Sequence, residues 1–155
     1  MGDETFHIAE AKGAKDGRPA ALEEYLPKGQ TFANWRKLVS VRRFPEIASP
    51  KDYVEKMVAE YRRQYPAMKF EAGKGPGGLY YMDCIMYPLD REATRSADQF
   101  AEWNYFVARP AAAGIIVYQY AERFAEDFEA ADVKALRTRM LPILRKSVFV
   151  SGAGK

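Results

Sequence analysis

The chain has 155 residues, the length of one typical domain with a single sizeable core. Apolar residues make up 48% of it and aromatic residues 14%, which excludes disorder across the whole chain. The formal net charge of +3 lacks the concentrated basic footprint of a nucleic-acid-binding protein. No apolar run reaches the ~20 residues of a membrane-spanning helix, so we expect no integral membrane segment.

Three strands are predicted in the first third of the chain. Short strands are expected over 5–10 and 22–26, and the Gly- and Lys-rich segment 11–20 reads as the loop between them. In 38–44 the side chains alternate between two faces, which predicts a third strand that ends before Pro45.

A helix is predicted to begin at Ser49 and Pro50 and to end before Pro66. Serine is a favourable N-cap, proline suits the first helical position, and Asp52 favours the positive end of the helix dipole. From Tyr53 to Tyr65 apolar side chains recur at spacings of three and four, which gives the helix one apolar stripe to bury.

Four strands and a second helix follow. The strands are expected over 68–72, 79–87, 100–109 and 114–124, and the helix over 132–147. The strands form two hairpins, joined by the glycine-rich turn 73–78 and by 110–113. Pro142 removes a backbone donor and predicts a kink of the second helix near Thr138.

This order of elements predicts an α+β fold. We expect an antiparallel twisted sheet of about five to seven strands flanked by two main helices, an α/β/α sandwich. A single domain spans 1–155, with flexible tails at 1–4 and 150–155.

Cys84 is the only thiol and therefore the first candidate nucleophile. It shares a strand face with Tyr80, Met82 and Met86, and apolar surroundings keep a thiol neutral and inert. The only imidazole, His7, lies near the N-terminus with nothing local to orient it. We therefore favour a structural over a catalytic Cys84, and one cysteine and one histidine are too few for a zinc site unless carboxylates complete it.

Two further motifs are interpreted as structural. The run GKGPGG at 73–78 lacks the Gly-Lys-Ser/Thr ending of a phosphate loop and precedes a strand, so it predicts a turn. Asp90, Glu92 and Asp98 share a connecting segment with two arginines, and solvated charge is favoured there over a metal site. No cofactor and no metal is expected.

Basic doublets interleaved with aromatic residues raise the alternative of a stacking platform for single-stranded nucleic acid. The doublets fall on four different predicted elements, and acidic residues are nearly as numerous as basic ones. Scattered solvated charge is therefore favoured over nucleic-acid binding.

The candidates for a partner or ligand surface are aromatic: Trp35, Trp103, Tyr105, Tyr118 and Tyr120. Within the last hairpin, both sides of the strands are rather apolar. One interpretation, which we favour, is a sheet whose two faces are both covered by helices. The other is a partly open face that binds a small molecule or a protein.

Residues 24–31 (EYLPKGQT), followed by Asn34, Trp35 and the strand that ends at Phe44, resemble a group of short bacterial exported proteins of unassigned function. In that group a Pro-x-Gly-Gln-Thr and Asn-Trp segment precedes a strand and a helix. The element order, over about 23–149, resembles the Mog1/PsbP-like fold, whose members are mostly binding or assembly factors. The resemblance defines no catalytic residue.

The segment also has a direct physical interpretation. The amide side chains of Gln30 and Asn34 are placed to satisfy backbone groups of a turn, and the indole of Trp35 is placed to cover an edge of the core.

The first functional hypothesis is therefore a non-enzymatic binding or accessory protein, exported to the periplasm or secreted, as the resemblance implies. The alternatives are an immunity or inhibitor protein that occludes a partner, and a small hydrolase that uses Cys84 or a carboxylate pair. The start of the chain has no secretory signal pattern. A trimmed signal and a cytoplasmic location both remain open.

Overall fold

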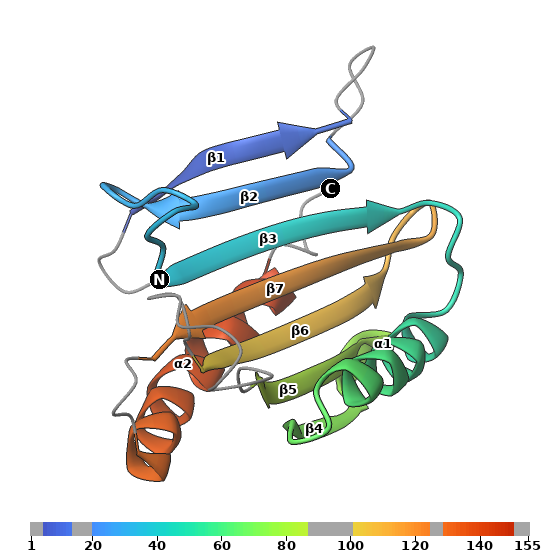
Figure 1. The fold of residues 1–155 in the computed structure, drawn as a ribbon. Helices are drawn as coiled ribbons and strands as arrows, with labels where there is room; N and C mark the ends of the chain where they lie inside the picture. Colours follow the sequence, from blue (N-terminus) through green and yellow to red (C-terminus); the bar gives the residue numbers. More distant parts are fainter. Residues whose placement is uncertain (1–4, 14–19, 87–100, 125–128, 151–155) are drawn as a thin grey trace.

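The computed structural model describes residues 5–13, 20–86, 101–124 and 129–150, the last five of these by their backbone only. In these residues seven antiparallel strands form one sheet, in the order β1-β2-β3-β7-β6-β5-β4 (Figure 1). The strands are β1 (Phe6–Lys12), β2 (Leu22–Pro27), β3 (Lys37–Phe44), β4 (Lys69–Lys74), β5 (Tyr80–Met86), β6 (Glu102–Pro110) and β7 (Ile115–Arg123). The predicted α+β fold with an antiparallel sheet is confirmed.

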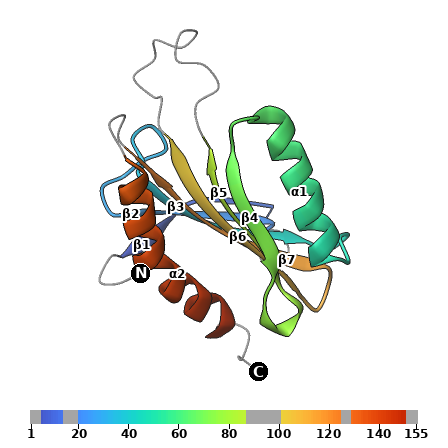
Figure 2. The same ribbon diagram turned by 90° about the horizontal axis from the view of Figure 1, so that it is seen from below.

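Two helices lie on opposite faces of the sheet (Figure 2). Helix α1 (Pro50–Gln64) follows β3 and contacts β4, β5 and β6, while α2 (Ala130–Val150) ends the described chain. After α1 the chain adds β4, β5 and β6 in turn and then returns with β7 to pair with β3. The middle of the sheet is therefore formed by two strands whose paired residues are 71 to 85 positions apart in sequence, such as Ser40 beside Gln119.

The start of α1 follows from its sequence. Ser49 adopts an extended backbone, and its hydroxyl accepts a hydrogen bond from the Asp52 N–H at 3.1 Å, which satisfies one of the donors left free at a helix N-terminus. The apolar stripe then packs on the sheet through Val54, Met57 and Tyr61.

Each face of the sheet carries its own core cluster. The α1 face buries Met82, Cys84, Phe106, Ile115 and Val117. The α2 face buries Trp103, Tyr105, Val107 and Tyr120 beneath Leu136, Met140 and Leu144 of α2. Because the side-chain period of a strand is two, neighbouring residues of β6 supply opposite clusters.

The glycine-rich run joins two strands, as predicted. Its middle forms a short 3-10 turn, η1 (Pro76–Gly78), in which Gly77 and Gly78 take φ values of 66° and 75°. Such positive φ values are costly for residues with a side chain. The run opens no α-helix and therefore lacks the N-terminus that would bind phosphate.

Helix α2 is longer than predicted and continues through Pro142. In Figure 2 it changes direction along its length, in keeping with a proline that leaves a carbonyl of the preceding turn unpaired. The predicted tails lie outside the described residues, except for Val150, which is the last residue of α2. The carboxylates Asp90, Glu92 and Asp98 also lie outside the described residues.

The helices do not cover the sheet evenly. In Figure 1, β1, β2 and most of β3 stand clear of α1. The side chains of β1 are half-buried or exposed, and Ile8, which lies on the α2 face because its partner Tyr25 pairs with Val39, is 59% exposed. On the other face α1 therefore covers β4–β6 and does not extend over β1, β2 and most of β3.

Candidate functional site

The five aromatic candidates do not assemble into one surface. Trp103, Tyr105 and Tyr120 retain 0%, 4% and 2% of their exposure and pack beneath α2, with Tyr118 half-buried against the same cluster. Trp35 lies with the residues of the opposite face. The three buried side chains belong to the core, which is the interpretation that the sequence favoured. A binding role for Trp35 and Tyr118 stays a prediction.

The loop before β3 is held by its amide side chains. The Gln30 Oε1 atom accepts hydrogen bonds from the backbone N–H groups of Arg36 and Lys37, at 2.7 and 3.3 Å. The Asn34 Oδ1 atom accepts one from the Thr31 N–H at 2.7 Å. The predicted role of these amides in satisfying the turn is confirmed.

Trp35 covers the edge of a small cluster of buried residues, Leu26, Leu38 and Ala121. The guanidinium of Arg123 lies over its ring at 3.7 Å, a favourable cation–π geometry. The predicted structural role of the indole is thus confirmed, and it fixes the loop against the α1 face.

Cys84 has the environment of an inert thiol. It is 1% exposed, and burial, with smaller contributions from Asp83 and Glu102, raises its pKa from 9.0 to about 12. His7 lies on β1, five inter-strand steps from Cys84 on β5 in the sheet order, or roughly 24 Å. The two groups cannot act as a nucleophile and its base in this arrangement.

A buried ion pair anchors α2 to the sheet. Asp83 is 5% exposed; its Oδ1 accepts a hydrogen bond from Trp103 Nε1 at 2.7 Å, and its Oδ2 accepts one from Arg137 Nε at 2.8 Å. Arg137 also reaches Glu71 at 3.5 Å, and Glu71 accepts a hydrogen bond from the Tyr81 hydroxyl at 2.9 Å. Helical spacing places Arg137 largely away from the apolar stripe of 132–147, so this pair was not predicted from the sequence. Every charge in it has an opposite charge, so its role is structural.

The α1 face carries a row of polar side chains across its centre, formed by Ser40, Arg42, Gln119 and Asn104 and called the polar strip below. Ser40 Oγ donates to Gln119 Oε1 at 3.1 Å, and Gln119 Nε2 donates to Asn104 Oδ1 at 2.7 Å. Asn104 Nδ2 then donates to Glu102 Oε1 at 2.9 Å. Ser40 and Asn104 are both 0% exposed, so three adjacent strands share a buried hydrogen-bonded row.

Arg42 ends the polar strip beside α1. Among the residues that the structure describes, its side chain makes one hydrogen bond, a long contact of 3.5 Å from Nη2 to Gln119 Oε1, and its buried Nε has no partner. Tyr53 and Tyr61 of α1 lie close enough for its charge to act on them. Burial raises the pKa of both tyrosines, that of Tyr61 to about 12, and the Arg42 charge opposes this rise.

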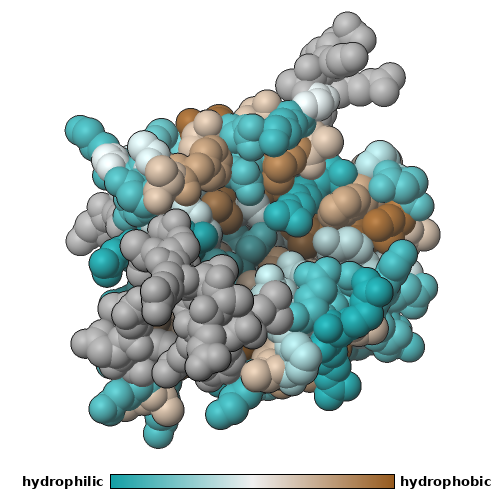
Figure 3. Space-filling model, viewed as in Figure 1, coloured by the Kyte–Doolittle hydropathy of each residue, from teal (hydrophilic) through white to brown (hydrophobic). Residues whose placement is uncertain are grey.

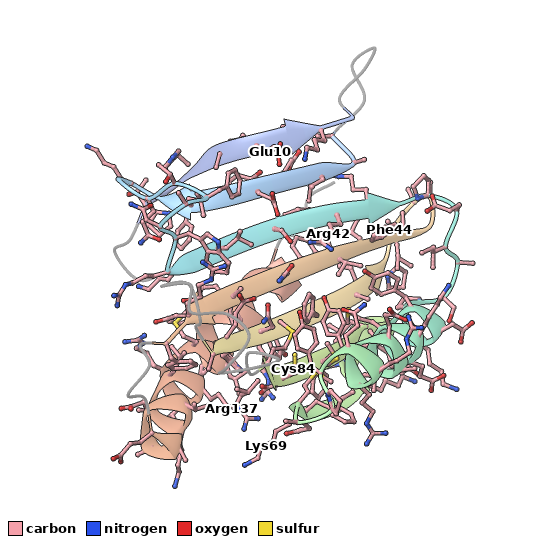
Figure 4. The ribbon with its side chains drawn as sticks, in the orientation of Figure 1. Glu10, Arg42, Phe44, Lys69, Cys84 and Arg137 are labelled. Carbon is pink, nitrogen blue, oxygen red and sulfur yellow. The ribbon has the colours of Figure 1, made fainter. Side chains whose placement is uncertain are left out.

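The surface around Arg42 is hollowed. Figure 4 shows Arg42 and Phe44 on β3, with Cys84 further down beside α1; Phe44 contacts Tyr53 of α1, so Arg42 lies at the boundary of the part of the face that α1 covers. In the space-filling view the centre of this face is recessed and hydrophilic, between the β1–β3 half and α1 (Figure 3). The strip lies on the central strands β3, β7 and β6 of this face.

One signal for the strip was present in the sequence. Ser40 and Arg42 fall on the same face of the predicted strand 38–44, and Asn104 and Gln119 are polar interruptions of apolar strands. The pairing of β3 with β7, which brings them together, was not predictable from these residues alone.

Among the described residues, no three His, Cys, Asp or Glu side chains gather in a group that could hold a metal ion. Neither of the described helices combines the length and the apolarity required to cross a membrane.

The fold and its sites define an α+β protein with one antiparallel sheet between two helices and a polar strip on one face. A family model matches residues 3–146, and the chain therefore belongs to that family, whose function is uncharacterised. No curated protein and no solved structure matches the chain.

Proposed function

We propose that this protein is a non-enzymatic binding protein that holds a ligand in the depression over the polar strip. One observation carries the proposal: the buried hydrogen-bonded row ends in a half-buried arginine that has no counter-ion among the described residues, at the boundary of the part of the sheet that α1 covers. Buried polar groups that serve stability alone are paired, as Asp83 and Arg137 are.

The enzymatic alternative has less support. The thiol of Cys84 is buried and its pKa is raised to about 12, so almost none of it is thiolate at neutral pH. The strip itself offers amides, a hydroxyl and a guanidinium. These groups bind and orient a ligand, but none of them is a base poised near pH 7.

The finer proposals of origin rest on the resemblance of 24–35 and of the element order. They are a Mog1/PsbP-like fold, membership of the short bacterial exported proteins, and a periplasmic or secreted location. The sheet between two helices and the loop built on Gln30 and Asn34 are in keeping with them.

The test is a ¹H–¹⁵N NMR titration of the labelled protein with a panel of small molecules grouped as carboxylates, phosphate esters, sugars and amines. We expect at least one group to shift the backbone amides of Ser40 and Gln119 while those of Leu136 and Met140 in α2 stay fixed. Steady-state assays with ester, amide and phosphoester substrates serve as the control for hydrolase activity.

Two results would overturn the proposal. One is a panel in which no compound shifts the strip at millimolar concentration while a protein partner protects β1–β3 from hydrogen exchange, which favours the inhibitor alternative. The other is hydrolysis that disappears in Cys84→Ala.

A further inference from the structure

We infer that the group recognised at the polar strip is an oxyanion, a carboxylate or phosphate carried by a small molecule, and that Arg42 is its principal contact. The inference rests on the proposed function and names the chemical class of its ligand.

The charge balance of the neighbouring arginines singles out Arg42. The next residue, Arg43, lies on the opposite face and pairs with Glu23 at 3.2 Å. Arg123, at the other end of the α1 face, pairs with Glu102 at 3.5 Å. Among the described residues Arg42 has no carboxylate partner. Removing a charge from water without a counter-ion is unfavourable, and a bound anion offsets that cost.

The hydrogen-bonding capacity of Arg42 is nearly unused. A guanidinium has five N–H donors, and in Arg42 a single long contact to Gln119 occupies one of them. Two parallel N–H donors match the two oxygens of a carboxylate or phosphate, which makes arginine the residue best suited to bind these groups.

The surrounding side chains add neutral donors. The hydroxyls of Tyr53 and Tyr61 keep their protons, since burial raises both pKa values above 10. Phe44 packs against Tyr53 with ring centroids 5.2 Å apart, which holds that tyrosine over the end of β3. Protonated hydroxyls donate to an anion without adding a charge of their own.

An acidic side chain of this face lies across the strip. Glu24 lies opposite Ser40 on β2, and the contact of Arg42 with Gln119 of β7 turns the guanidinium the other way. A ligand therefore meets positive charge toward α1 and negative charge toward β2. This polarity favours a small molecule that presents its oxyanion to the tyrosine side.

The opposite face supplies a matched control. Arg109 is also half-buried, and its buried Nε also lacks a partner, but its guanidinium lies 5.2 Å over the ring of Tyr118 and donates to the Tyr118 hydroxyl at 2.9 Å. Arg109 is thus occupied by an aromatic partner in the way that Arg42 is not.

The experiment titrates inorganic phosphate and, separately, succinate into the wild type, Arg42→Gln and Arg109→Gln at constant ionic strength maintained with sodium chloride. Dissociation constants come from calorimetry. Hydrogen bonds to charged groups are strong enough that we expect Arg42→Gln to weaken binding by about ten- to a hundred-fold. Arg109→Gln should change the dissociation constant by less than about two-fold. Arg42→Lys keeps the charge but loses the two parallel N–H donors, so its loss of affinity should lie between those of the two glutamine variants.

A measurement on the wild type alone tests the inference even if a variant fails to fold. The ¹H–¹⁵N correlation of arginine Nε–H groups should show Arg42 shifting with phosphate or succinate while Arg109 stays fixed. A preference for phosphate over succinate, or the reverse, identifies which kind of oxyanion is bound.

Equal loss of binding in Arg42→Gln and Arg109→Gln, or an Arg42 resonance unmoved by either anion, would overturn the inference. If a sugar or an amine from the panel shifts Ser40 and Gln119 while both anions fail, the oxyanion is wrong and the proposed function stands. If nothing shifts the strip, both fail.

Discussion

Two arginines of this protein lie against opposite faces of the sheet and differ in their partners. Arg137 reaches from α2 to the buried Asp83 at 2.6 Å, and Trp103 completes the hydrogen bonding of that carboxylate. Arg42 extends over the α1 face and meets an amide at 3.5 Å and no carboxylate among the described residues. An arginine thus holds a helix to the sheet in one place, and in the other an arginine keeps most of its N–H donors unused.

The difference follows from what covers each face. The α2 face is closed over an aromatic cluster, and the charges there have partners: Arg137 pairs with Asp83, and Arg109 lies over the ring of Tyr118. The α1 face is closed over β4–β6 and open beyond, so a charge at the boundary is partly solvated and remains available. The boundary between covered and open sheet is therefore where a ligand site is expected.

The largest expected effect is on the closed side. Arg137→Leu leaves the Asp83 carboxylate buried without its counter-ion and should lower the free energy of unfolding by about 3 kcal/mol. Urea denaturation followed by far-UV circular dichroism measures it. Arg139→Leu is the control, because Arg139 is 62% exposed and 3.8 Å from Glu122, and it should lose less than about 1 kcal/mol. Equal losses of unfolding free energy in the two variants would mean that the buried pair stabilises the fold no more than the exposed one does.

A second variant tests whether α1 is held by apolar packing alone. Met57 is half-buried in the cluster of the α1 face, and Met57→Asp places a carboxylate there without a partner. We expect a loss of about 2–3 kcal/mol in the same denaturation experiment. Ala59→Asp, at an exposed position of the same helix, should lose less than about 1 kcal/mol, mostly from helix propensity. A Met57→Asp protein as stable as the parent contradicts the assigned stripe.

The pH dependence of the free energy of unfolding tests whether Cys84 is buried in the part of the α1 face that the helix covers. Its pKa is raised from 9.0 to about 12, so the folded state keeps a proton that the unfolded state loses. The stabilisation is complete below pH 9 and is lost as the pH rises toward 12. Between pH 9 and 10 the Cys84 thiol should lower the free energy of unfolding by up to about 1.4 kcal/mol per unit, in addition to the fall caused by tyrosines such as Tyr53 and Tyr61, whose pKa values are also raised by burial.

The measurement is the denaturation midpoint of the wild type and of Cys84→Ala at several pH values in that interval. The variant should show a shallower slope, because only the contribution of the tyrosines remains. In the folded wild type at pH 8, a thiol reagent should label Cys84 only at the rate of unfolding. Fast labelling of the folded protein is the result that contradicts a closed cluster.

The smallest expected effect is on the open side. Arg42→Gln removes a half-buried charge that has no counter-ion among the described residues. The free energy of unfolding should therefore change by less than about 1 kcal/mol in either direction. Thermal unfolding in phosphate-free buffer measures it. A loss as large as that of Arg137→Leu would show that Arg42 is an anchor as well.

The sequence predicted the elements well because each carries a strong local signal. The cap at Ser49 and the period from Tyr53 to Tyr65 define α1, and the alternation in 38–44 defines β3. The amides of Gln30 and Asn34 act within a few residues of themselves, so their role was also predictable. Strand faces follow from the period of two, which placed Cys84 correctly among Met82 and Met86.

The site was predicted less well, since it depends on partners far apart in the chain. Asp83 and Arg137 are 54 residues apart, and helical spacing assigned Arg137 to the solvent side. The long arginine side chain reaches across the edge of the stripe to the carboxylate, which a periodicity argument does not capture. The aromatic residues were candidates because both faces of their strands are apolar, and α2 buries three of them.

By itself the sequence determined which segments are strands and helices, which side of each is apolar, and that its single thiol is buried. The tertiary structure decided which polar side chains meet, because the return of β7 beside β3 brings Ser40 and Gln119, 79 positions apart, into contact. It also decided which half of the sheet stays open. Local periodicity fixes the direction of a side chain, but only long-range pairing fixes its neighbours, and the fate of a buried charge depends on its neighbours.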